Sequence, residues 1–152
     1  MIHTKRLMSE PDTDGLADLM RTQQRLVEEM LFRTIELSVL VESGQHRFIG
    51  RALDDLERAE RELGRTELVR AAMTEAILGS KPGAEPALAD VLSVVDDERS
   101  AVIARTGEEI RATLEEIDRV RRDAAHAVAE RVARARRAAS AASSTTGLYG
   151  RS

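Results

Sequence analysis

Two runs of apolar residues at heptad spacing flank a short break, Glu42-Ser43-Gly44-Gln45, and this pattern restricts the chain to long packed helices. The heptad positions before the break are Leu16, Met20, Gln23, Val27, Met30, Thr34, Leu37 and Val41, and those after it include Ile49, Leu56 and Leu63. Gly44 suits the left-handed backbone that ends many helices, because it has no Cβ to clash. A connection this short favours antiparallel neighbours, so we expect a helical hairpin with its tip at this break.

The rest of the chain extends this hairpin into an all-α fold. A loop from Gly79 to Pro86 precedes a short apolar segment, and a final helix carries Ile103, Ile110 and Ile117 seven residues apart. The spacing predicts helices over about 15–42, 45–78, 87–95 and 98–140. We expect a flexible lead over 1–14, a single helical domain over 15–139 and a disordered tail over 140–152. The predicted architecture is an elongated antiparallel hairpin or three-helix coiled-coil bundle with a long C-terminal helix.

The composition suits long amphipathic helices better than a compact mixed fold. Charged residues make up 33% of the chain and aromatic residues only 2%, so bulky ring packing is absent. The chain has no cysteine, which excludes disulfides and thiolate metal sites. No apolar run approaches the roughly 18 residues of a membrane span, so we expect no membrane insertion and a cytoplasmic protein.

No residue pattern indicates catalysis. His3, His46 and His126 are scattered, and none has ligand-type neighbours at the spacing of a metal site. The chain also lacks a glycine-rich phosphate loop and a serine nucleophile elbow. We therefore expect neither an enzyme nor a bound cofactor or metal.

Charge is unevenly distributed along the sequence. Seven arginines and two acidic residues lie between Arg119 and Arg137, a net charge of +5, whereas the whole chain carries −4 and the remainder therefore −9. Three interpretations remain open for this segment: a docking surface for another helix, a solvated helix face, or a nucleic-acid contact. The segment has no aromatic residue for base stacking and the chain is acidic overall, so we expect no nucleic-acid partner.

The order of elements resembles the FlgN family of flagellar type III export chaperones. The features that carry the resemblance are Leu26 to Leu31, Glu36-Leu37 with Val39-Leu40, Gly44, the Ile49-Leu56-Leu63 stripe, Glu67-Leu68-Val69-Arg70, the Gly79 to Pro86 loop and Leu148-Tyr149-Gly150. The chain departs from the family pattern in two ways. It contains no asparagine in its last helix, and it ends in Arg151-Ser152 where the family tends to have a further glycine.

The resemblance implies a cytoplasmic chaperone, monomeric or weakly oligomeric, that binds the helical terminal segments of hook-associated proteins and delivers them to the flagellar export gate. Our hypothesis for client contact is a thin apolar strip with flanking arginines and an accessory pair at the end of the chain: Ala124, Val128, Arg131, Val132, Arg134, Ala135, Leu148 and Tyr149. Arg121 is a further arginine expected to steer the client. The alternative is a structural or adaptor coiled-coil protein that self-associates through the same heptads.

Overall fold

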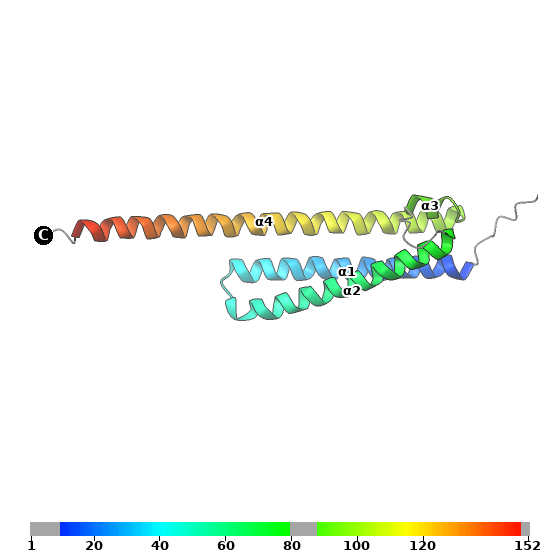
Figure 1. Cartoon of the computed structure of the whole chain (residues 1–152), viewed down its shortest axis with the longest axis horizontal. Coiled ribbons are helices and arrows are strands. Elements are labelled where there is room, and N and C mark those ends of the chain that lie inside the picture. The colour runs from blue at the N-terminus through cyan, green and yellow to red at the C-terminus, as the bar shows by residue number, and fades with distance from the viewer. Residues whose placement is uncertain (1–9, 80–87, 150–152) are drawn as a thin grey trace, which may run out of the picture.

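The computed structural model describes residues 10–79 and 88–149, and the regular structure there is entirely helical. Helix α1 spans Glu10–Glu42, α2 spans His46–Leu78, α3 spans Leu88–Leu92 and α4 spans Asp97–Tyr149. The three long helices lie roughly side by side in an elongated bundle (Figure 1). The predicted all-α fold class is confirmed.

The turn between α1 and α2 forms at the predicted break, between Glu42 and His46. Gly44 adopts a φ of 71°, in the left-handed region. The Gly44 N–H donates to the Val41 carbonyl and the Gln45 N–H donates to the Leu40 carbonyl, at 3.3 and 3.0 Å. This pair of bonds is a Schellman motif, which satisfies carbonyls that the end of α1 would otherwise leave free. The chain then enters α2 directly at His46.

An aspartate side chain begins α4. The Arg99 backbone N–H donates to the Asp96 carboxylate at 3.0 Å, which satisfies one of the free amides of the first helical turn. The Arg99 guanidinium also donates to Asp96 at 2.7 Å and to Asp14 of α1 at 3.0 Å. The start of α4 is therefore tied both to its own cap and to the start of α1.

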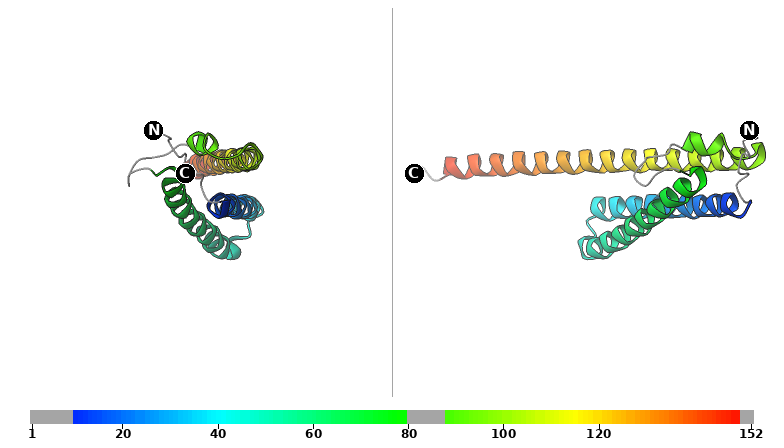
Figure 2. Two further views of the ribbon diagram at one scale, coloured as in Figure 1. Left: turned by 90° about the vertical axis from the view of Figure 1, so that its right-hand side faces the viewer. Right: turned by 45° about the vertical axis from the view of Figure 1, so that its right-hand side comes forward.

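Helix α1 is the central element, because α2 and α4 both pack against it. Helix α2 runs antiparallel to α1, as the ion pair between Arg33 and Asp55 indicates. Helix α4 runs parallel to α1, since the Gln24 amide donates to Glu109 while Arg131 reaches the last carbonyls of α1. Helix α2 crosses α1 obliquely, so that its end lies near α3 while its start lies away from α4 (Figure 2).

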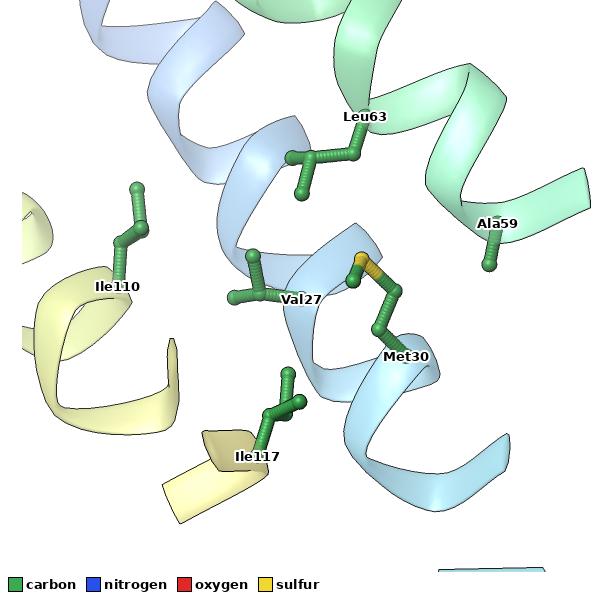
Figure 3. Packing of buried hydrophobic residues seen from close by; sticks show 6 residues of the cluster. All are labelled: Val27, Met30, Ala59, Leu63, Ile110 and Ile117. Atoms are coloured by element: carbon green, nitrogen blue, oxygen red, sulfur yellow. The ribbon is translucent and has the colours of Figure 1, made fainter. Parts of the chain in front are cut away.

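Two apolar clusters hold the three helices together. One contains Val27, Met30, Ala59, Leu63, Ile110 and Ile117, with α1 between the other two helices (Figure 3). The other contains Leu16, Met20, Ile77, Val91 and Ile103 and lies where α3 covers the start of α4. The predicted heptad positions therefore form the core as far as Thr34, the last buried residue of α1. We call the end of the bundle at α3 the closed end and the opposite end the hairpin tip.

Two predicted boundaries are wrong. Helix α1 begins at Glu10, so residues 10–14 of the predicted flexible lead are helical, with Pro11 in the first turn where its missing N–H costs nothing. Residues 1–9 of that lead lie outside the described residues. Helix α4 continues to Tyr149, so residues 140–149 of the predicted disordered tail are also helical. Ser144 and Thr145 satisfy their hydroxyls by donating to carbonyls four residues earlier in the helix, which lets them continue it.

Candidate docking groove

An apolar groove of about 460 Å³ opens between α1 and α4 near the hairpin tip. Its apolar lining comes from all three long helices: Leu37, Val41, Leu56, Ala124, Ala125, Ala127, Val128 and Ala129. Thr34, Ser38, Glu42, Arg121 and Arg131 complete the lining. We call this feature the docking groove. Apolar groups converging on an open groove are the usual basis for binding a partner's apolar side chains.

The crossing angle of α2 explains why the groove lies here. At the closed end, the end of α2 and the short helix α3 cover the α1 and α4 surfaces. At the tip, α2 lies away from α4, and among the described residues no helix covers the corresponding surface (Figures 1 and 2). Leu37 and Val41 continue the α1 heptads but are only partly buried. The docking groove is thus an open continuation of the bundle core.

Alanines shape the α4 wall of the groove. After Ile117, the inward positions of α4 change from isoleucine to alanine and valine, and Val128 is 43% exposed. Small side chains let another helix approach closely, whereas larger ones would fill the space from within the chain. The change in residue size therefore creates room between α4 and the hairpin.

Two arginines of the groove make contacts within the chain. Arg121 of α4 pairs with Glu60 of α2 at 2.5 Å, which bridges the groove. Arg131 donates from its two terminal nitrogens to the carbonyls of Val41 and Glu42, at 3.0 and 2.6 Å. These carbonyls lie at the negative end of the α1 dipole, which favours a cation there. Arg131 therefore anchors α4 to the hairpin tip.

The structure brings part of the predicted client site together. Ala124, Val128 and Arg131 line the docking groove. Val132, Arg134 and Ala135 lie beyond the level of the hairpin tip, on the exposed continuation of α4. Leu148 and Tyr149 fall in the last turn of α4, and their side chains lie outside the described residues. The three arginines expected to steer the client have different surroundings. Arg121 and Arg131 make contacts within the chain, whereas the side chain of Arg134 is exposed.

Helix α4 continues past the hairpin tip, where no other helix of residues 10–79 and 88–149 packs beside it. Arg131 is level with the end of α1, so the remaining residues, 132–149, extend about 27 Å further at 1.5 Å per residue (Figure 1). We call them the α4 extension. Its side chains from Arg134 to Thr145 are exposed. The docking groove and the α4 extension lie on one helix, so a ligand seated in the groove has a surface along which to continue.

Leu37, Val41 and Leu56 were not predicted as site residues. Their heptad spacing indicated buried core positions, and that spacing was the available signal. They line the groove for two reasons. The α4 residues opposite them are mostly alanines, which are too small to fill the space, and α2 crosses α1 in a direction that leads away from α4. Periodicity within each helix does not give the crossing angle between helices.

Two further features bear on the function of the described part of the chain: clusters of metal-ligating side chains and helices able to span a membrane. Residues 10–79 and 88–149 contain no group of three or more histidine, cysteine, aspartate or glutamate side chains that would hold a metal ion. Within the same residues, no helix combines the length and hydropathy that a bilayer crossing requires. Comparisons of the chain with protein-family models, curated proteins and solved structures find no match.

Proposed function

We propose that this protein is a non-enzymatic chaperone that binds a helical segment of another protein in the docking groove. The single observation that carries this proposal is the groove itself, an open continuation of the bundle core that no helix of the described residues covers. An amphipathic helix seated there would bury its apolar face against Leu37, Val41 and Val128, as in other helix-in-groove complexes.

The FlgN-like order of elements supplies the identity of the partner in this proposal. The clients are the helical terminal segments of flagellar hook-associated proteins, bound in the cytoplasm and released to the export gate. Masking an amphipathic helix requires no nucleotide or catalytic group, which suits a chain built of packed helices. The alanine-rich α4 wall buries little area per residue, so the affinity would be moderate and release at the gate easier.

Co-purification with candidate hook-associated proteins tests this function. The informative variant is Val128→Glu, which places a charge on the groove wall, and its matched control is Val69→Glu on α2, where the valine is 50% exposed and outside the groove. We expect the wild type and Val69→Glu to capture the client and Val128→Glu to lose most of the capture. Failure of the wild-type chain to capture any hook-associated protein would refute the flagellar identity.

Self-association is the second candidate, because the outer face of α1 carries exposed apolar side chains. Phe32 is 58% exposed and Val39 is 54% exposed, and they lie seven residues apart, on one face of the helix. Sedimentation velocity of the wild type and of a Phe32→Glu variant tests this alternative. A stable dimer that the substitution dissociates would favour a structural coiled-coil protein, whereas a wild-type monomer would favour the chaperone.

A further inference from the structure

The kind of helix that fits the docking groove follows first from the shape of the bundle. At the closed end, α2 and α3 lie on the surface that α1 and α4 form together. At the tip, α1 contributes Leu37 and Val41 and α4 contributes Val128 to a surface that no helix among the described residues covers. Rows of side chains form ridges and grooves along the whole length of a helix, so the surface at the tip can also pack against a helix. The shape therefore favours an amphipathic helix.

The charge of the partner follows from how this chain arranges its arginines. Elsewhere, arginines of the long helices pair with acidic residues three or four positions away, as Arg21 does with Asp18, Arg33 with Glu29 and Arg111 with Glu108. No acidic residue follows Glu130, and in the part of the chain that the structure describes Arg134, Arg136 and Arg137 form no ion pair. The α4 extension is therefore a surface of exposed positive charge.

Two of these arginines flank the line that continues the groove wall. At about 100° per residue, Arg134 and Arg136 project to opposite sides of Ala135, which follows Val128 on the same helix face. The helix dipole does not explain this placement, because its effect is confined to the last turn of a helix and these residues lie about four turns before Tyr149. Arginines on both sides of an apolar line match carboxylates on both sides of an apolar helix face.

We propose that the docking groove and the α4 extension bind an amphipathic helix whose apolar face is flanked by acidic residues. The apolar face seats between α1 and α4, and the acidic flanks meet Arg134 and Arg136 beyond the hairpin tip. This inference rests on the proposed helix-binding function and adds the charge of the bound segment. It holds for any protein that carries such a helix, so its test does not depend on the flagellar identity of the client.

The test uses two labelled peptides and the full chain. Both peptides have about 26 residues, the number in α4 from Ala124 to Tyr149, so that as helices rising 1.5 Å per residue they can span that whole stretch, and both carry the same leucine face. One has glutamates along the flanks and the other has lysines. Fluorescence anisotropy measures each affinity at low and at physiological salt. The variant is Arg134→Glu with Arg136→Glu, and the control is Arg65→Glu with Arg105→Glu, which changes the net charge equally at exposed positions outside the groove.

We expect the glutamate peptide to bind the wild type at least about tenfold more tightly than the lysine peptide at low salt, with a smaller ratio at physiological salt, because exposed charges are screened. We also expect Arg134→Glu with Arg136→Glu to weaken binding of the glutamate peptide about tenfold, and the control to weaken it clearly less. Equal affinity for the two peptides, or equal loss in variant and control, would overturn the inference.

Three further results would also overturn it. A 24-nucleotide single-stranded RNA that bound more tightly than the glutamate peptide at physiological salt would assign the basic surface to nucleic acid. A dimer that Val128→Glu dissociates would assign the groove to a second copy of this chain. Capture of hook-associated proteins without any preference for the glutamate peptide would support the proposed function but refute the inference that the bound helix has acidic flanks. Conversely, peptide preference without such capture would sustain the acidic helix and refute only the flagellar identity.

Discussion

Gln23 is a polar residue in the apolar core of the bundle, and its replacement by methionine should stabilise the protein. Its side chain is 1% exposed, and its Oε1 atom has no hydrogen-bond donor. It lies on the α1 heptad stripe between Met20 and Val27, both fully buried. A buried acceptor without a partner has lost its hydrogen bonds to water and forms none in the folded protein, which lowers the free energy of unfolding by roughly 1–3 kcal/mol. Methionine has a similar unbranched shape and removes that acceptor.

We expect Gln23→Met to raise the free energy of unfolding by about 1–2 kcal/mol, since part of the gain is offset by fitting a slightly larger side chain. For a chain of this size, that corresponds to a rise of roughly 2–8 °C in the melting temperature. Chemical denaturation followed by circular dichroism at 222 nm measures the free energy, and calorimetry measures the melting temperature. Sedimentation velocity should accompany both, because buried polar residues in coiled coils help to fix the oligomeric state.

The next residue supplies the control. Gln24 is half-buried at the edge of the contact between α1 and α4, where its amide donates to the Glu109 carboxylate at 2.5 Å in a bond that is exposed to solvent. Gln24→Met makes the same chemical change but removes an exposed hydrogen bond, so we expect no gain and a loss below about 1 kcal/mol. If the two variants changed stability equally, or if Gln23→Met destabilised the fold, the Oε1 of Gln23 would be satisfied in solution and the reasoning would be refuted.

Three further predictions concern the ends of the helices. Gly44→Ala should destabilise the protein by about 1 kcal/mol, because alanine resists the φ of 71°, whereas Gly50→Ala, inside α2 with open space around a new Cβ, should stabilise it by about 0.5–1 kcal/mol; urea denaturation distinguishes the signs. Arg131→Gln should speed amide hydrogen exchange at the hairpin tip with little change at the closed end, because the α1 carbonyls lose their guanidinium donor. Hydrogen bonds from Arg99 lower the pKa of Asp96 below its usual 3.8, so the stability from this contact is present above that pH and is lost as the pH falls through the lowered value; Asp96→Asn should therefore reduce the loss of stability in acid below about pH 4, measured by thermal melts.

Much of the fold could be predicted because its signals are local. A glycine followed by a new heptad run predicted the hairpin, and Gly44 does adopt the left-handed backbone there. Isoleucines seven apart predicted the inward face of α4, and Ile103, Ile110 and Ile117 are all buried. In each case, the residues that carry the signal lie within a few turns of one another. Such patterns survive in the folded chain because every helix must bury its own apolar stripe.

The end of α4 was wrongly predicted because composition competed with helix propagation. The segment after Ser140 is small and polar, which is typical of disordered chain. It follows a long alanine- and arginine-rich helix, however, and adding a residue to an existing helix costs far less than starting one. The hydroxyls of Ser144 and Thr145 also find acceptors within the helix. Propagation from a strong helix therefore extends α4 to Tyr149.

The docking groove required information that no single segment carries. Its position depends on α4 lying parallel to α1 with Arg131 level with the hairpin tip, and on the direction in which α2 crosses α1. The change from isoleucine to alanine along α4 is visible in the sequence, and alanines bury little apolar area from Ala124 onward. The sequence did not indicate that Leu37 and Val41 lie opposite those alanines. Contacts between segments far apart in sequence set that register.

The two ends of the bundle therefore differ in what they stabilise. At the closed end, Leu16, Met20, Val91 and Ile103 are completely buried, and the ion pair of Arg99 with Asp14 joins α4 to α1. At the tip, apolar residues of the same heptads remain partly exposed, and hydrogen bonds from Arg131 replace apolar packing. Regions with few buried apolar contacts open at lower free energy than the core. A ligand helix in the docking groove would supply the missing apolar contacts, so binding and local stability at the tip would rise together while the closed end stays unchanged.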